Sequence, residues 1–172
     1  MTYQWTTCAF GYYLIMFQLK YWPGDIYINT IASTVAGNIA YVVSTWIYTR
    51  SGIKPSFVGL FSMSVVGGAC VLVMGESVSI WMPVFVTFAS FGITGAFMIV
   101  YLCMVDVFPT LFVSTAMGFC NFMARVMTIA APIVAELAPP LPMSLFVSMT
   151  SLAVVLTFLI KPVGQGRDKK VK

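Results

Sequence analysis

One arginine of this sequence lies inside a long apolar stretch, where a charge is costly. Arg125 follows a run without charged residues from 107 to 124, and the next charged residue is Glu136. A charged side chain near the middle of a membrane helix costs roughly 3 kcal/mol or more, and it usually faces a cavity or a partner. We interpret Arg125 as a cation that faces a bound solute. The alternative is a side chain that snorkels to the interface or pairs with a carboxylate of a neighbouring helix.

Further polar residues of apolar stretches could line the same cavity, Gln18 and Asn29 among them, and three of these residues enter the predicted site: Tyr12, Tyr13 and Asn121. Their hydroxyl and amide groups can hydrogen-bond a solute, although tyrosine is also typical of membrane interfaces and asparagine of contacts between helices. Taken one at a time, each residue is explained by an interface or by a contact between helices, without a solute. Taken together with Arg125, they form the solute-binding site that we predict.

Residues suited to catalysis or metal binding are scarce. Histidine, the commonest metal ligand and a frequent general base, is absent from the sequence. The acidic residues lie near the ends of apolar stretches, so no acid–base pair emerges. The cysteines are far apart, without the C-x-x-C spacing of zinc sites; they are Cys8, Cys70, Cys103 and Cys120. We therefore expect no enzyme, no metal site and no cofactor.

The composition places the chain in a membrane. Of its 172 residues, 60% are hydrophobic and 8% are charged, whereas soluble domains carry about 25% charged residues. The mean hydropathy is +0.96. So few charges cannot cover the surface of a soluble fold, which excludes a soluble enzyme and a disordered chain. The lipid bilayer is therefore the first partner that we expect.

Charged residues divide the chain into apolar runs of membrane-spanning length. A helix needs about 20 apolar residues to cross the hydrocarbon, and the runs lack the alternation of barrel strands. We predict an all-α membrane protein with a six-helix transmembrane domain, 1–161, and a basic polar tail, 162–172. Pro132 is expected to kink the fifth helix. The predicted helices are 3–21, 27–49, 56–74, 80–104, 113–135 and 143–161.

Basic residues are distributed unequally between the two sides of the predicted bundle. With six crossings both termini share one side, and the positive-inside rule places that side in the cytoplasm or in an equivalent compartment such as the matrix. The basic residues of the shared side and of the tail explain the net charge of +4. The charge therefore does not indicate a nucleic-acid partner. The shared side holds seven of the nine basic residues: Arg50, Lys54, Lys161, Arg167, Lys169, Lys170 and Lys172.

Small residues are concentrated in three of the predicted helices. Small side chains let helix backbones approach closely in a membrane, so these residues predict faces of helix contact. They are Ala32, Ala36 and Ala40 of the second helix, Gly67 and Gly68 of the third, and Gly92 and Gly95 of the fourth.

Two connections between the predicted helices resemble motifs of a known superfamily. The segment 50–54 (R-S-G-I-K) resembles the D-R-x-G-R-K/R loop of the major facilitator superfamily. The segment 106–110 (D-V-F-P-T) resembles the E-x-[YF]-P-T motif after the tenth helix of its organic cation/anion/carnitine transporter family. Further pieces agree in order: Trp5 with Tyr12, 24–29, 68–70, and 121–125 followed by Pro132.

This resemblance spans the chain and implies the C-terminal six helices of a twelve-helix transporter. An arginine tends to stand where Arg125 stands in the anion and carnitine branches of the family, so an organic anion or zwitterion is implied as the solute. Tyr12 inherits a place on the substrate path. The gate and loop residues are implied to be Arg50, Gly52, Lys54, Asp106, Pro109 and Thr110.

The sequence also departs from the family pattern at several charged positions of the cytoplasmic gate. Such charges help to hold one state of a transporter whose halves rock against each other. Four charges are replaced: Thr49 stands for the Asp of the loop, Ile53 for its Arg, Val113 for the Arg expected after P-T-x-x, and Gly37 for an acidic residue of the eighth helix. In addition, Met127 replaces a Gly after Arg125.

Two functions stay open from the sequence. The first is a half-unit of a solute carrier for an organic anion or zwitterion, which needs a second six-helix half to enclose a path. The second is a transport-dead structural subunit, derived from a transporter, within a larger membrane complex. Both predict a second six-helix half or other membrane subunits as partners, and neither predicts a nucleic acid.

Overall fold

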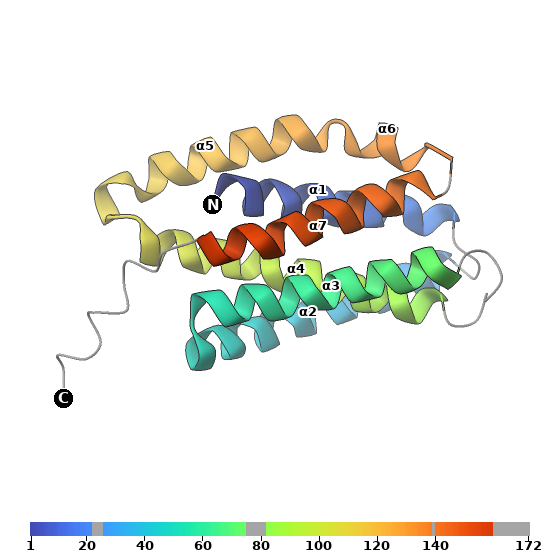
Figure 1. The fold of residues 1–172 in the computed structure, drawn as a ribbon, viewed down its shortest axis with the longest axis horizontal. Helices are drawn as coiled ribbons and strands as arrows, with labels where there is room; N and C mark the ends of the chain where they lie inside the picture. The colour runs from blue at the N-terminus through green and yellow to red at the C-terminus, as the bar shows by residue number, and fades with distance from the viewer. Residues whose placement is uncertain (22–25, 75–81, 139, 160–172) are drawn as a thin grey trace.

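The chain folds into helices joined by short turns wherever the structure describes it (Figure 1). This computed structural model describes residues 1–21, 26–74, 82–138 and 140–159. The predicted tail, 162–172, lies outside these ranges, as do 80–81 and 160–161 of two predicted helices. The elements are α1 (Thr2–Gln18), η1 (Leu19–Tyr21), α2 (Ile26–Ser51), α3 (Ile53–Met74), α4 (Met82–Val107), α5 (Thr110–Thr128), α6 (Ala131–Ala135) and α7 (Leu141–Leu159).

The helices run back and forth between the two ends of one bundle (Figure 1). One end, which we call the terminus end, holds Met1, the turn at Gly52, the connection at Pro109 and the end of α7 at Leu159. The opposite end holds η1 and the beginning of α2. Six passes result, because α1 continues into η1 and α5 into α6. The first and last described residues therefore lie at the same end, as the sequence predicts.

Five helical segments of the described part are each long and apolar enough to cross a membrane. The first pass is shorter, because α1 has 17 residues and reaches the opposite end only together with η1. The fold is an all-α, multi-pass membrane bundle, and its six passes are those of a major-facilitator half-bundle. The five segments are Thr30–Ser51, Ile53–Val73, Pro83–Val107, Thr110–Ala135 and Leu141–Leu159.

The fifth pass is interrupted between α5 and α6, as Pro132 predicts. Proline has no backbone N–H and cannot close a hydrogen bond to the preceding turn of a helix. The chain turns at 129–130, where Ile129 N donates to Arg125 O at 3.2 Å and Ala130 N donates to Met127 O at 3.1 Å. The second of these bonds is the tighter i to i−3 kind that ends many helices. The interruption therefore begins one turn after Arg125.

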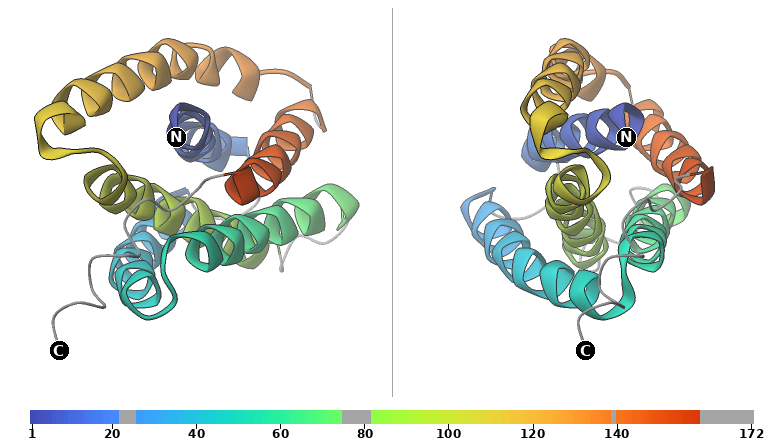
Figure 2. Two further views of the ribbon diagram at one scale, coloured as in Figure 1. Left: turned by 60° about the vertical axis from the view of Figure 1, so that its left-hand side comes forward. Right: turned by 90° about the vertical axis from the view of Figure 1, so that its left-hand side faces the viewer.

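The central helix of the bundle is α4. Its span is the most buried of the five, and the spans in α2 and α5 are the least buried. Helix α2 packs mainly on α4, and α5 packs mainly on α1. Figure 2 shows α5, α1, α4 and α2 following one another from top to bottom, with α7 and α3 to their right. We call the side formed by these four helices the four-helix face. Its outer members, α2 and α5, have no described helix on their far sides.

Glycines bring α3 and α4 into backbone contact. A Cβ added at Gly92 would lie 2.7 Å from Ser64 N, and one added at Gly67 would lie 2.7 Å from Ala89 N. Ser64 Oγ donates to Ala89 O across the same contact at 3.1 Å. The close packing predicted from glycine is confirmed at Gly67, Gly68, Gly92 and Gly95.

The contact face of α2 is offset from the predicted one. Ala40 and Gly37 are buried, but Ala32 is exposed, so the prediction was wrong at that residue. A strict four-residue repeat drifts around a helix of 3.6 residues per turn. The packed face follows the true period instead, through Ser33, Gly37, Ala40 and Ser44.

Candidate functional site

Arg125 is exposed on α5 and hydrogen-bonds a tyrosine of α1. Its Nη1 donates to Tyr13 Oη at 2.9 Å, and its guanidinium carbon lies 5.8 Å from the centroid of the Tyr13 ring. The ion pair of the described chain is elsewhere, between Lys20 Nζ and Glu136 Oε1 at 3.5 Å. Within the ranges that the structure describes, Arg125 has no carboxylate partner and its charge meets only a neutral phenol.

Two consecutive tyrosines of α1 connect Arg125 with a pocket on the other side of that helix. The Tyr12 and Tyr13 rings meet edge to face, with 5.5 Å between their centroids. Tyr13 is half-buried and bonds Arg125, while Tyr12 is more exposed and lines the pocket. The structure thus brings together three of the four predicted solute-binding residues.

The fourth, Asn121, lies on α5 one turn before Arg125. Helical spacing puts Ser114, Gly118, Asn121 and Arg125 on one face of α5, and all four are exposed. Asn121 makes no hydrogen bond to another residue of the described chain. Its contact with a solute stays a prediction.

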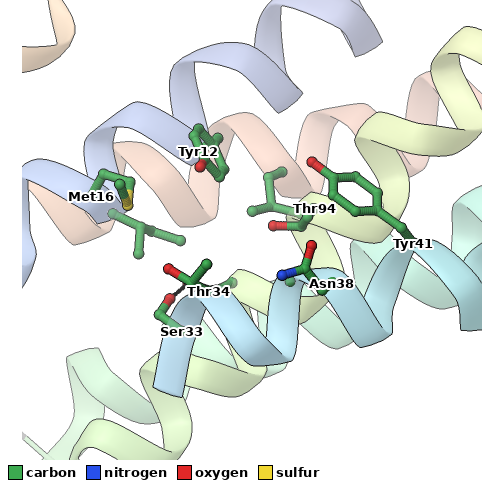
Figure 3. A pocket seen from close by; sticks show the side chains of 11 residues that line it. Tyr12, Met16, Ser33, Thr34, Asn38, Tyr41 and Thr94 are labelled. Carbon is green, nitrogen blue, oxygen red and sulfur yellow. Dashed lines mark hydrogen bonds between the residues drawn. The ribbon is translucent and has the colours of Figure 1, made fainter. Parts of the chain in front are cut away.

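A pocket of about 100 Å³ lies between α1, α2 and α4 (Figure 3). Its hydroxyl and amide groups come from three helices, and it is not lined by any charged side chain of the described part. Gly37 lines the pocket as well, so the position where the family usually has an acidic residue opens into it. The lining residues are Tyr12, Ile15, Met16, Ser33, Thr34, Gly37, Asn38, Tyr41, Ser90, Ile93 and Thr94.

Three of the pocket hydroxyls, those of Ser33, Thr34 and Ser90, are already hydrogen-bonded within the protein. Ser33 Oγ donates to Ser90 Oγ at 3.4 Å and links α2 to α4. Thr34 Oγ1 donates to Thr30 O at 2.8 Å within α2. These donors are occupied, so they contribute acceptor atoms to a ligand more readily than hydrogens.

Four other polar groups of the pocket make no hydrogen bond to a described residue. In Figure 3 the side chains of Asn38, Tyr41 and Thr94 lie close together on one wall, and Tyr12 lies across from them. Thr94 is 4% exposed as a residue, but its hydroxyl is not one of the buried side-chain groups of the described chain that lack a partner, which are Trp5 Nε1 and Thr7 Oγ1. The pocket therefore presents a group of unsatisfied neutral donors and acceptors.

The sequence did not single out Asn38, Tyr41 or Thr94. A lone Ser, Thr or Asn in a membrane helix is common at helix contacts, so each residue alone carries little signal. The available signal is periodic: Thr34, Asn38, Tyr41 and Thr45 recur every three or four residues of α2. That spacing puts them on one helix face, which we call the polar stripe of α2.

The predicted gate and loop residues all lie at the terminus end. Gly52 forms the turn between α2 and α3 with φ of 82°, a left-handed conformation that glycine adopts without steric cost. Lys54 Nζ donates to Phe158 O at 3.3 Å and joins α3 to the end of α7. Pro109 precedes α5, and Thr110 is its first residue.

Asp106 and Arg50 of the gate set have separate partners. Tyr48 Oη donates to a carboxylate oxygen of Asp106 and joins α2 to α4. The guanidinium of Arg50 lies 5.5 Å from the centroid of the Trp46 ring. Among the described residues, no ion pair links the gate positions. They meet at one end of the bundle without forming a charge network.

Metal-ligating groups are not clustered in the part of the chain that the structure covers. No set of three His, Cys, Asp or Glu residues there could hold an ion. The four cysteines are free thiols, three of them buried.

Comparison with known proteins identifies transporters. No protein-family model matches the chain. It is 30% identical over 147 residues to solute carrier family 22 member 15 of Xenopus tropicalis, which covers 80% of this chain and 27% of that protein. It is 26% identical over 159 residues to solute carrier family 22 member 16 of Bos taurus, covering 91% of this chain and 28% of the relative. It is also 26% identical over 162 residues to organic cation/carnitine transporter 2 of Homo sapiens, with the same two coverages, 91% and 28%.

The similarity runs through most of this chain but through a limited part of each relative. The chain spans 27% or 28% of the length of these three proteins. The all-α, multi-pass fold agrees with a membrane transporter. Over most of its length, the chain is a homologue of the organic cation, anion and carnitine transporters of solute carrier family 22, in the major facilitator superfamily.

Proposed function

We propose that this chain is a six-helix half-unit of a membrane solute carrier that acts on an organic anion or zwitterion together with a second six-helix half. Arg125 is the observation that carries the proposal. It is exposed, it is oriented by Tyr13, and it has no carboxylate partner in the described chain. The neutral phenol of Tyr13 does not balance the charge of the guanidinium, and an uncompensated charge at membrane depth is costly. The anionic group of a solute would be that partner.

The two exposed stripes of α2 support a second half. One stripe is apolar and suits lipid, whereas the polar stripe would leave hydroxyl and amide groups in hydrocarbon, which is unfavourable. Halves of this superfamily are related by an axis along the membrane normal, so a second half can cover the four-helix face. It would then cover the polar stripe and leave the apolar stripe in lipid. The apolar stripe consists of Ile31, Val35, Ile39, Val42 and Trp46.

The terminus end is proposed to face the cytoplasm or an equivalent compartment. In the sequence this side carries seven of the nine basic residues, among them Arg50 and Lys54. Short loops rich in Lys and Arg stay on the side from which a membrane protein is inserted.

Uptake by proteoliposomes tests this function. The protein is purified by mild extraction with its bound subunits, reconstituted, and offered a panel of labelled organic carboxylates. We expect saturable uptake of at least one anion, a loss of about tenfold or more for Arg125→Ala, and normal uptake for Lys20→Ala, which removes a cation at the opposite end. A tenfold loss corresponds to about 1.4 kcal/mol, a modest demand on one charge pair. Uptake of no anion, or equal uptake by Arg125→Ala, contradicts the proposal.

A transport-dead structural subunit is the second candidate, and the terminus end favours it. There Asp106 bonds Tyr48, Lys54 bonds a backbone carbonyl, and Arg50 lies against Trp46. Each charge is held locally instead of bridging two moving parts. Native electrophoresis after gentle extraction separates the candidates: a scaffold migrates in a large complex and gives no uptake, whereas migration as a small oligomer counts against it.

A further inference from the structure

The pocket between α1, α2 and α4 is too small to hold a whole solute of ordinary size. Its volume is about 100 Å³, whereas pockets that enclose drug-sized ligands have about 300–1,000 Å³. No charged side chain of the described chain lines it, so it offers no counter-charge to an ion. In this half alone it holds only a part of a solute, and it offers that part hydrogen-bonding groups without a counter-charge.

The unsatisfied groups of the pocket define the chemistry of that part. Asn38 offers two N–H donors and one carbonyl acceptor, and the hydroxyls of Tyr12, Tyr41 and Thr94 can each donate and accept. None of these four side chains makes a hydrogen bond within the described chain, so each can bond a ligand group in the pocket. A ligand group that both donates and accepts suits such a mixed set of donors and acceptors. Hydroxyl and carboxamide groups do so.

We propose that this pocket is the subsite for the uncharged end of the solute, and that this end carries a hydroxyl or a carboxamide. The inference rests on the proposed function, in which Arg125 binds the anionic end. The Tyr12–Tyr13 pair lies between the two subsites, because Tyr12 lines the pocket and Tyr13 bonds Arg125. The solute class is therefore a small organic acid with a polar, uncharged far end. Simple alkyl acids are poor solutes.

The test compares acids of equal charge that differ at the far end: 3-hydroxybutyrate, 4-hydroxybutyrate and succinamate against butyrate. Each is measured as KM for uptake in the reconstituted protein. We expect at least one polar-ended acid to have a KM about tenfold or more below that of butyrate, because a site built for a hydrogen-bonding group rejects an analogue without it. Equal KM values for all four acids overturn the inference.

Variants assign the preference to the pocket. Asn38→Leu and Thr94→Val should raise the KM of the polar-ended acids to within about threefold of the KM of butyrate measured in the same variant. Thr115→Val, an exposed threonine of α5 outside the pocket, is the matched control and should keep the preference. Asn38 is exposed on α2, so its variant does not depend on repacking of the core. A preference that survives both pocket variants places the subsite elsewhere and overturns the inference.

The same assay separates this inference from the proposed function. A preference for polar-ended acids that persists at full rate in Arg125→Ala keeps the subsite and removes the proposed role of Arg125. Anion uptake that depends on Arg125 but ignores the far end keeps the carrier and removes the subsite. No uptake of any acid, butyrate included, removes both.

Discussion

At the scale of single residues, Gly37 is the position where one substitution would add a charge to the pocket. A Cβ added there would lie 3.6 Å from Thr94 Cγ2, which is ordinary contact, so an aspartate can begin at this position without a backbone clash. Gly37→Asp should therefore place a carboxylate among neutral groups. At an effective dielectric constant near 20 a carboxylate attracts a cation at contact by about 4 kcal/mol. We expect tetraethylammonium to raise the melting temperature of Gly37→Asp but not that of the wild type.

Gly37→Asn is the matched control for that variant, since it has the same size without the charge. It should respond to tetraethylammonium as the wild type does. Equal shifts in melting temperature for the Asp and Asn variants would show that a solute cannot reach position 37 in the pocket.

The residues of the site were predictable to different degrees. Arg125 stands out from sequence because a lone charge in an apolar run is rare, and Tyr13 proves to be its hydrogen-bond partner. Asn38, Tyr41 and Thr94 do not stand out, because polar neutral residues also serve helix contacts. Which of the two roles each residue has depends on where α1, α2 and α4 cross, and no local pattern contains that information.

At the scale of elements, the α3–α4 contact depends on the absence of side chains at two glycines. A Cβ at Gly92 would lie 2.6 Å from Leu60 O, and backbone cannot move aside cheaply. Gly92→Ala should therefore separate the helices and destabilise the bundle by about 1–3 kcal/mol, the usual cost of overpacking. Thermal unfolding in detergent measures the change.

Gly118→Ala is the control for this helix contact. Apart from its chain neighbours and the backbone of its own helix, no described residue lies within 4 Å of a Cβ added there, and alanine is the better helix former by about 0.5–1 kcal/mol. Its melting temperature should be unchanged or slightly raised. If Gly92→Ala is as stable as Gly118→Ala, the two helices are not in the close contact described.

The terminus end offers a second test at this scale. Tyr48→Phe removes the hydroxyl that joins α2 to Asp106 of α4 and keeps the ring. Because Asp106 is exposed and solvent weakens the bond, we expect a loss of about 1 kcal/mol, seen as a lower melting temperature. Tyr101→Phe, whose hydroxyl makes no hydrogen bond within the described chain, should leave the melting temperature unchanged; equal loss in both variants would refute the link.

The elements themselves were largely predictable. The charge-free runs place the ends of the predicted helices within about three residues of the observed ones, because lipid permits helices and excludes charges over one fixed length. Pro132 correctly predicted a disturbance in the fifth pass. The sequence did not predict that α1 would end in the 3-10 turn η1. It also did not predict that Ala32 would be exposed, outside the packed side of α2. Both depend on neighbouring helices.

At the scale of the whole molecule, the proposed function assigns one side of the surface to lipid and another to a solute path. Asn38 and Ile39 of α2 lie at nearly the same depth, since a helix rises only 1.5 Å per residue. Both are exposed in this chain. They differ in direction, because Asn38 belongs to the polar stripe and Ile39 to the apolar one. If a second half faces the polar stripe across a water-filled path, position 38 lies in water. Position 39, on the apolar stripe, then lies in lipid.

Thiol labelling of these two positions is the most direct test. Asn38→Cys and Ile39→Cys are introduced separately, and permeabilised membrane vesicles are treated with a sulfonate-bearing thiol reagent, with the wild type as background for the four native cysteines. A thiol reacts as its thiolate, which forms in water and not in hydrocarbon. We predict that Cys at 38 reacts about tenfold or more faster than Cys at 39, and that a transported organic anion slows only the reaction at 38. Equal rates, or faster reaction at 39, would contradict a solute path along the four-helix face.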